Sequence, residues 1–538
     1  MIDPSMSVVD PRTPRLSPAV PASLPEPSAP QRWDHRLSYA LLAVGALVVV
    51  AVFVVFQTYP NYDTYYTLVW GKELAHWQLP DYDVLRTPTP HPLSTLVGWL
   101  MAPFGTASDR ILVLASLFGL LGFYAAAFVF CERLLGRPIA LIAVAVLLTR
   151  TDMQLLALRA MFDLPFYLLV FGAAVLELRR PRCGWPVLVV LALAGLLRPE
   201  AWLLAGAYWL WLAPPAALRF PPRPAGSSSA DASPAGGSAP GLAARPQLIR
   251  YALLVAAAPL IWVAADLIVT GEPLYSLTST REVSGEFGRN RGLVDAIAHI
   301  PEYSGGNDRS VTVGVGGLGM LLAVYVLRRR AALPLALGGL GVLTFLIIAA
   351  AGLSVIPRYM TIPSLLLSLC VAVALGGWTL VGGRTPRRVA IGIAIVSALV
   401  LCWRAPYYYR DFSKLADQAS FIEAQHTGLK RILDAPRVVP ALQRCRPITV
   451  PSHSAIPVIR YETGLPKEAI EASIAQRRPP RSGLLLIGRT FNFEPGAGRA
   501  NTSFRPRASA RKRWSNKPLP GFDRIGRSLR WKAFARCS

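Results

Sequence analysis

The stretch LSYALLAVGALVVVAVFVVF, residues 37–56, decides the fold class. It contains no charged residue and is long enough to cross a lipid bilayer as one helix. The rest of the chain is similar in character, since 53% of the 538 residues are hydrophobic and only 16% are charged. Soluble proteins carry about 25% charged residues. These figures exclude a soluble multidomain protein, a disordered chain and a disulfide-dense secreted scaffold, and they predict a polytopic α-helical membrane protein.

Ten further apolar segments follow, so we expect about 11 transmembrane helices. Several segments are shorter than the roughly 20 residues of a full span. The pair 185–197 and 201–213 is the weakest and could form a re-entrant hairpin. The ten segments are 109–130, 138–149, 163–178, 185–197, 201–213, 250–269, 311–327, 332–351, 360–382 and 387–403.

The positions of the arginines predict the orientation in the membrane. Cytoplasmic connections are enriched in Lys and Arg. With a cytoplasmic N-terminus, every connection expected inside is basic, as shown by Arg133 and Arg137, Arg179, Arg180 and Arg182, Arg219, Arg223 and Arg245, Arg328 to Arg330, and Arg384, Arg387 and Arg388. We therefore expect a multi-pass protein of the cytoplasmic membrane with its N-terminus inside and its C-terminus outside. Topology explains much of the net charge of +25, so we expect no nucleic-acid partner.

Composition divides the chain into three parts. We expect a disordered cytoplasmic N-terminus at 1–36, a transmembrane domain at 37–405 with outer loops at 57–108 and 270–308 and a flexible cytoplasmic loop at 214–249, and a basic extracytoplasmic domain at 406–538.

The C-terminal part should fold as a small α/β domain. From Asp411 onward it holds 24 Lys plus Arg residues against 9 Asp plus Glu residues. Short strands are predicted within 447–460 and at 483–488, and an amphipathic helix at 417–433. The end of this part looks too basic and too poor in core residues to fold firmly.

Two of the six cysteines, Cys445 and Cys537, fall in the expected outer domain. An oxidising compartment would allow them to form one disulfide, and two unpaired thiols are the alternative.

Ionisable residues gather near the predicted outer ends of the spans. Such residues cost free energy beside short spans unless they line a wet cavity, so we expect a cavity that opens outward. Asp63 could act as a general base or could hold a divalent cation, Mg²⁺ or Mn²⁺, together with Asp81 and Asp83. Arginines offer forked donors that match a phosphate. Each group also has a structural reading, such as a turn at Asp81 and Asp83 or a helix-end ion pair between Arg198 and Glu200.

Four short motifs stand at these outer positions. They are Asn61-Tyr62-Asp63-Thr64-Tyr65-Tyr66 after the first span, Thr87-Pro88-Thr89-Pro90-His91-Pro92-Leu93 before the next helix, Leu196-Leu197-Arg198-Pro199-Glu200 between two short spans, and Arg358-Tyr359 at the start of a later span.

With these motifs, residues 37–405 resemble the GT-C superfamily of membrane glycosyltransferases. That superfamily includes protein O-mannosyltransferases, the lipid A aminoarabinose transferase and actinobacterial arabinosyl- and mannosyltransferases. The resemblance implies an inverting transferase that moves an arabinose- or mannose-like sugar from a polyprenyl phosphate to a cell-envelope glycan, lipid or protein.

The resemblance also implies site residues. The acidic residue of the first outer loop, here Asp63, would be catalytic or metal-linked, and Asp152 or Asp163 would match a second acidic position. The family's usual acidic pair is missing, because Thr64 follows Asp63. Residues expected to hold the donor phosphate or the substrate are Arg198, Glu200, Arg358, Tyr359, Arg159, Arg281, Arg86, His91 and Tyr65.

Two other functions are compatible with this sequence. A transporter of lipid carriers would usually show internal repeats and charges at the membrane midplane, and neither is evident. A non-catalytic scaffold for envelope assembly is the second alternative, because Asp63 lacks its acidic partner.

Overall fold

The structure is a computed structural model that describes residues 35–213, 245–306, 308–476, 478–489, 493 and 516–537. Most of the predicted N-terminal segment 1–36 and of the loop 214–249 lies outside these residues. The chain divides into two compact units, residues 1–47 and 48–538. All the contacts described below lie within the second unit.

Each of the eleven predicted apolar segments lies largely within a helix. These helices are α1 (His35–Val55), α4 (Ser108–Leu135), α5 (Arg137–Leu148), α7 (Asp163–Arg179), α8 (Trp185–Leu197), α9 (Glu200–Leu212), α10 (Arg245–Thr270), α13 (Gly316–Leu327), α14 (Ala332–Ala350), α15 (Thr361–Gly376) and α16 (Arg384–Leu433). The apolar runs therefore predict the helices correctly.

Fewer than eleven of the described helices pass a test of length and apolar composition for crossing a membrane. Within the described ranges, five helical stretches are long and apolar enough to cross a membrane. A sixth is added if α5 and the following α6 (Thr151–Leu158), bent by 64° relative to each other, are one span. The helices α8 and α9 have only 13 residues each. The expected total of 11 transmembrane helices is therefore not confirmed.

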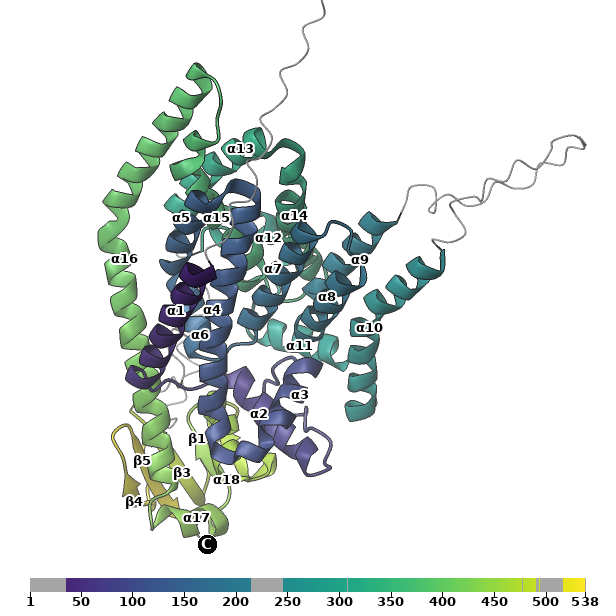
Figure 1. The fold of residues 1–538 in the computed structure, drawn as a ribbon. Helices are drawn as coiled ribbons and strands as arrows, with labels where there is room; N and C mark the ends of the chain where they lie inside the picture. Colours follow the sequence, from purple (N-terminus) through teal and green to yellow (C-terminus); the bar gives the residue numbers. More distant parts are fainter. Residues whose placement is uncertain are drawn as a thin grey trace, which may run out of the picture. The chain divides into compact units, whose positions relative to one another are not determined.

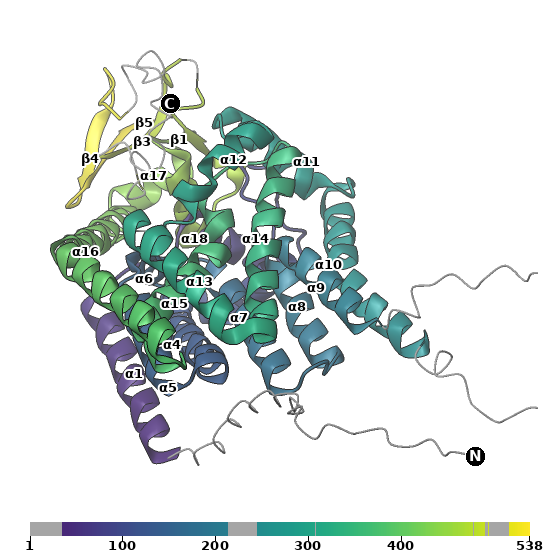
Figure 2. The same ribbon diagram turned by 90° about the horizontal axis from the view of Figure 1, so that it is seen from above.

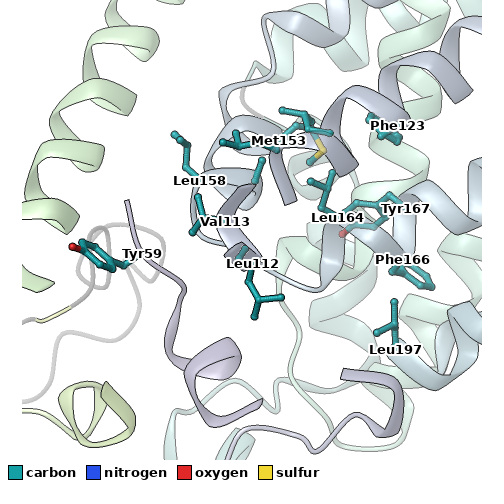
Figure 3. Packing of buried hydrophobic residues seen from close by; sticks show 14 of the residues in the cluster. Tyr59, Leu112, Val113, Phe123, Met153, Leu158, Leu164, Phe166, Tyr167 and Leu197 are labelled. Carbon is teal, nitrogen blue, oxygen red and sulfur yellow. The ribbon is translucent and has the colours of Figure 1, made fainter. Parts of the chain in front are cut away.

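The largest core lies among α4, α5, α7, α8 and α15. Figure 3 shows Phe123 of α4 close to Leu164 and Tyr167 of α7, and these three side chains are almost inaccessible to solvent. Small residues allow other helices to approach closely, as is usual in membrane proteins. A Cβ atom on Gly319 of α13 would overlap the carbonyl of Cys370 in α15. Figure 2 shows α8, α9 and α10 side by side at another part of the bundle.

The predicted outer loop 57–108 contains two helices, α2 (Tyr62–Ala75) and α3 (Pro92–Met101). They cross at Gly71 and Gly98, where a Cβ atom on either glycine would overlap the backbone of the other helix. The crossing fixes the start of α2, which carries Asp63, relative to the start of α3, which follows His91.

The predicted loop 270–308 is also largely helical, with α11 (Tyr275–Glu286) and α12 (Gly292–Tyr303). Both predicted outer loops are therefore built largely from helices rather than irregular backbone.

The C-terminal part contains a five-stranded sheet in the order β2-β1-β3-β5-β4. The strands are β1 (Ile448–Val450), β2 (Ile470–Ala472), β3 (Gly483–Gly488), β4 (Asp523–Arg527) and β5 (Trp531–Arg536). Strand β1 pairs in parallel with β2 and β3, and β5 pairs antiparallel with β3 and β4. Figure 1 shows the sheet at one end of α16, near α17 (Val438–Arg444) and α18 (Ile456–Thr463).

Three expectations for this part need correction or comment. The predicted strand 447–460 ends at Val450, and α18 begins soon after it with Pro457 in its first turn, where no backbone N–H is needed. The end of the chain, expected to fold poorly, does form the strands β4 and β5. Trp531 of β5 anchors them, since it is buried and donates a hydrogen bond to the Gln425 carbonyl at 3.1 Å. Helix α16 runs through residue 405 without a break, so the expected domain boundary falls inside a helix.

The structure joins Cys445 and Cys537 in a disulfide, with Cα atoms 4.9 Å apart. The bond ties the end of β5 to the residue that follows α17.

Candidate functional site

A cavity of about 220 Å³ lies where the segments 57–108 and 270–308 meet the ends of α7, α8, α9 and α10. Seven of the residues singled out from the sequence line it, namely Asp63, His91, Asp163, Arg198, Glu200, Arg358 and Tyr359. They are spread over almost 300 positions of the chain, so the fold brings them together.

Asp63 lies in the first turn of α2. The side chain of Asn61 caps this helix by accepting a hydrogen bond from the Thr64 N–H at 3.1 Å. A helix N-terminus stabilises a carboxylate in its first turn. The Asp63 Oδ2 atom is 3.8 Å from Arg358 Nη1, and 36% of its side chain is exposed. Asp63 therefore lies at a helix N-terminus and beside a guanidinium, while part of it faces the cavity.

Arg198 lies at the break between α8 and α9. Pro199 cannot continue α8 and instead precedes the first residue of α9, Glu200. The Arg198 guanidinium bonds Glu200 Oε1 at 2.6 and 2.9 Å and also bonds Asp163. This cation is buried but fully compensated by two carboxylates.

Arg358 belongs to the short 3₁₀ turn Pro357–Met360 before α15. Its Nε atom is 3.4 Å from Asp163 and its Nη1 atom is 3.8 Å from Asp63, both longer than an ordinary charged hydrogen bond. Its Nε atom has no hydrogen-bond partner in the described structure, although 35% of the side chain is exposed. The guanidinium of Arg358 therefore has N–H donors that the carboxylates of this site do not fully use.

His91 lines the cavity between the two arginines. Burial, Arg198 and Arg358 lower the pKa of His91 to about 3. Its Nδ1 atom is buried and lacks a hydrogen-bond partner among the described residues. His91 is therefore neutral near pH 7, and its Nδ1 atom is available to form a hydrogen bond with a ligand.

Apolar side chains from α8, α9, α10, α11 and α14 form much of the remaining wall. Trp202 and Trp262 meet edge to face with ring centroids 5.7 Å apart, and Trp262 also contacts His91 at 5.5 Å. The wall further includes Leu197, Leu274, Leu277 and Ile348. The cavity therefore has an apolar surface beside its charged end.

Sequence reasoning missed Asp266, which also lines the cavity. Its two carboxylate oxygens accept hydrogen bonds from the backbone and the hydroxyl of Ser276, at 2.8 and 2.7 Å. A carboxylate inside the apolar segment 250–269 was the signal that could have found it.

Asp152 lies apart from this cavity. It pairs with Arg150 at 2.5 and 3.0 Å. Of the two alternatives for the second acidic position, only Asp163 lines the cavity with Asp63.

Four other predicted residues also lie outside the cavity lining. Tyr65 is buried and donates a hydrogen bond to Asp109 at 3.0 Å. Arg159 is buried, and its carbonyl accepts a hydrogen bond from the Asn61 N–H at 2.9 Å. Arg281 packs against Gly352, and Arg86 pairs with Glu286 at 3.3 Å.

The predicted metal ligands do not meet. Asp81 pairs with Lys467 at 2.8 Å, and the largely exposed Asp83 lies 3.5 Å from the same amine, while Asp63 faces the cavity. Over the described residues, no group of three or more His, Cys, Asp or Glu side chains is placed to hold a metal ion.

Comparison with known proteins gives a single kind of match. No protein-family model matches the chain, and no curated protein matches it. Among solved structures, the crystal structure of ArnT from Cupriavidus metallidurans bound to undecaprenyl phosphate is similar, with a TM-score of 0.47 and 12% sequence identity. The match covers 93% of this chain and 98% of ArnT.

Proposed function

We propose that this protein is a membrane glycosyltransferase that moves a sugar from a polyprenyl phosphate to a cell-envelope acceptor. The observation that carries the proposal is the cavity, which joins the carboxylate of Asp63 to the loosely held guanidinium of Arg358 beside an apolar wall. All four motifs that resemble the GT-C superfamily contribute a side chain to this cavity.

The arginines would hold the phosphate of the donor. When the glycosidic bond to phosphate breaks, negative charge grows on the phosphate oxygens, and nearby guanidinium groups stabilise it. We assign this role to Arg358, whose donors are not saturated by Asp63 and Asp163. Arg198 would act mainly by fixing Asp163, because its own contacts to Asp163 and Glu200 are already close.

Asp63 would act on the acceptor. It would orient the attacking hydroxyl and take its proton as the new glycosidic bond forms at the anomeric carbon. The donor phosphate leaves from the opposite face with the electrons of the broken bond, so one such displacement inverts the anomeric centre. The contact between Asp63 and Arg358 supports this assignment, because it would put the base next to the leaving phosphate.

Three features of the apolar wall suit a lipid-linked donor. The wall is formed by Trp202 and Trp262 together with aliphatic side chains of several helices. It lies in the same cavity as the charged groups, and helices apolar enough to cross a membrane reach it. We accordingly propose residues 37–405 as the catalytic part, with its cavity on the outer face of the cytoplasmic membrane, the N-terminus inside and the basic residues 406–538 outside.

The test is sugar transfer by the purified protein in nanodiscs. A panel of polyprenyl-phosphate sugars is offered with cell-envelope extracts as acceptors, with Mg²⁺, Mn²⁺ or EDTA. The Asp63→Asn variant is compared with Asp152→Asn, a carboxylate outside the cavity. Transfer that is lost only in Asp63→Asn supports the proposal and identifies the sugar. A folded wild-type protein that binds undecaprenyl phosphate but transfers no sugar from any donor would instead indicate a carrier or scaffold.

A further inference from the structure

A second group of side chains lies next to Asp63 but outside the cavity. It contains Tyr62, which directly precedes Asp63, together with Arg86, Phe287, Arg289 and His453. These residues come from the two outer loops and from the C-terminal part of the chain. None of them lines the cavity described above.

Arg86 is held in a strained backbone conformation. Its φ angle of 57° falls in the left-handed region, which a residue with a Cβ atom rarely adopts. The hydroxyl of Tyr62 donates to the carbonyls of Leu85 and Arg86, at 3.1 and 3.0 Å, and so braces this turn. Strain of this kind persists where the surrounding structure fixes it, and it often marks a functional site.

Arg289 has no carboxylate partner in the described structure, and its buried Nε atom has no hydrogen-bond partner there. Its guanidinium carbon lies 4.5 Å from the ring centroid of Phe287, and that of Arg86 lies 4.7 Å from the same centroid. One aromatic ring thus supports two cations. Among the described residues, the one carboxylate paired with either of them is Glu286, which is 47% exposed and contacts Arg86 at 3.3 Å.

Arg289 is also close to the candidate catalytic pair. Burial and the Arg358 guanidinium lower the pKa of Arg289, while Asp63 opposes this effect. Its carbonyl accepts a hydrogen bond from the Val355 N–H at 2.9 Å, which ties it to the segment before Arg358.

His453 completes the group from the C-terminal part of the chain. Its Nδ1 atom is 3.4 Å from Arg86 Nη1, and its ring meets the Tyr62 ring edge to face at 5.3 Å. Burial and Arg86 lower the pKa of His453 to about 3, so the ring is neutral and adds no charge of its own near pH 7.

We propose that Arg86 and Arg289, both stacked on Phe287, bind an anionic group of the acceptor and so hold its hydroxyl against Asp63. The inference rests on the proposed glycosyltransferase function and names a substrate class for it, an acceptor that carries a phosphate or a carboxylate. Two reasons assign the group to the acceptor. These arginines lie outside the cavity that would hold the donor, and they adjoin the carboxylate that would activate the acceptor. Guanidinium groups bind both anions with paired hydrogen bonds.

The first test is binding of small probes to the full-length protein in nanodiscs of zwitterionic lipid, without donor. The probes are glucose 6-phosphate, glucuronic acid and the neutral methyl glucoside, measured by saturation-transfer NMR. We expect at least one charged sugar to bind about tenfold more tightly than the neutral one, as a charged hydrogen bond allows. Comparison of the two charged sugars separates a phosphate site from a carboxylate site.

The matched variants are Arg289→Gln and Arg291→Gln. Arg291 lies two positions along the same segment but pairs with Asp295 at 3.7 Å. We expect Arg289→Gln and Arg86→Gln to abolish the preference for charged sugars and Arg291→Gln to keep it. Equal binding of charged and neutral sugars by the wild type, or a preference that survives the double variant Arg86→Gln/Arg289→Gln, would overturn the inference.

A kinetic measurement separates this inference from the proposed function. If the protein transfers sugar, Arg289→Gln should raise the KM for the acceptor about tenfold and leave the KM for the polyprenyl-phosphate donor unchanged. Transfer without any preference for charged sugars would leave the enzyme and reject the anion site. A charge preference lost in Arg289→Gln, without transfer from any donor, would leave the anion site and reject the enzyme.

Discussion

Two cavities of similar volume in this protein are lined by arginine, but Arg358 in one and Arg150 in the other are bound differently. The candidate site has about 220 Å³, and a second cavity of about 240 Å³ lies among α5, α15, α16 and the segment before α13. Arg150 lines the second cavity. It bonds both oxygens of Asp152, at 2.5 and 3.0 Å, and the hydroxyls of Ser364 and Ser368 at 2.9 and 2.8 Å.

Of the two arginines that line the candidate site, Arg358 is bound much less completely than Arg150. Arg358 has only contacts of 3.4 and 3.8 Å to Asp163 and Asp63, and it is 35% exposed, whereas Arg150 is 5% exposed. The comparison shows that a cavity and a buried cation do not suffice to locate a site. What distinguishes the candidate site from a structural ion pair is that the guanidinium of Arg358 keeps N–H donors without close acceptors in the described structure.

The largest effect on sugar transfer should be the difference between removing the carboxylate of Asp63 and removing that of Asp152. Asp63→Asn should lower kcat for sugar transfer by about 10²- to 10⁴-fold, because a general base is lost. Asp152→Asn should retain transfer per folded molecule, since Asp152 pairs with Arg150 and does not line the candidate cavity. The measurement is the initial rate of transfer in nanodiscs, normalised to folded protein. Equal losses in both variants would remove the distinction between the two cavities.

Substitution of Arg358 should mainly weaken lipid binding, whereas substitution of Arg150 should mainly lower the stability of the fold. Arg358→Gln should weaken undecaprenyl phosphate binding about 10- to 100-fold, the value of a hydrogen bond to a charged group, with little change in the melting temperature. Arg150→Gln should leave binding intact and lower the free energy of unfolding by about 2–3 kcal/mol, because Asp152 loses its partner. Native mass spectrometry measures the binding, and thermal unfolding measures the stability. Loss of undecaprenyl phosphate binding in Arg150→Gln, together with unchanged binding in Arg358→Gln, would contradict these roles.

His91 should make the candidate site sensitive to acid. The pKa of His91 is about 3 in the folded protein, below its usual 6.5, so between these values the unfolded chain binds the proton more readily. Its neutral form therefore contributes stability that is complete above pH 6.5 and is lost as the pH falls toward 3. The loss between pH 6.5 and 5 should be about 1–2 kcal/mol, and His91→Gln should remove it.

The control for this prediction is His76→Gln, which changes an exposed histidine. Melting temperatures of the three proteins are compared from pH 7 to pH 5. A wild-type profile parallel to that of His91→Gln would show that His91 is protonated as easily in the folded protein as in the unfolded chain.

The smallest effect is expected at a contact that belongs to neither cavity. Lys467 of the C-terminal part pairs with Asp81 at 2.8 Å, with 29% and 27% of the side chains exposed. Partly exposed ion pairs contribute at most about 1 kcal/mol, so Lys467→Gln should change neither transfer nor lipid binding and should lower stability only slightly. A large loss of transfer would show that this contact helps to set the first outer loop.

The sequence predicted the helices better than it predicted which charges face the cavity. Each apolar run predicted a helix because long apolar segments have one favourable structure in a membrane. The helices within 57–108 and 270–308 were not predicted. The motif residues around Asp63, Arg198 and Arg358 do line one cavity. Asp152 and Tyr65 occur in equally polar surroundings, yet their partners, Arg150 and Asp109, satisfy them elsewhere.

This difference could not be read from the chain. Asp152 and Asp163 both begin helices near a predicted outer end. Which of them points toward Asp63 depends on the 64° bend between α5 and α6 and on the packing of α7 against α4. The partners of Arg289 and Asp266 likewise depend on how the loop 270–308 folds over the helices.

The most direct measurement is a cryo-EM structure of the protein in nanodiscs with undecaprenyl phosphate. The account predicts phosphate density within hydrogen-bond distance of Arg358, near Asp63, with the prenyl chain along Trp202 and Trp262. Phosphate density at Arg150 in the second cavity, or a lipid bound with the cavity around Arg358 empty, would contradict it.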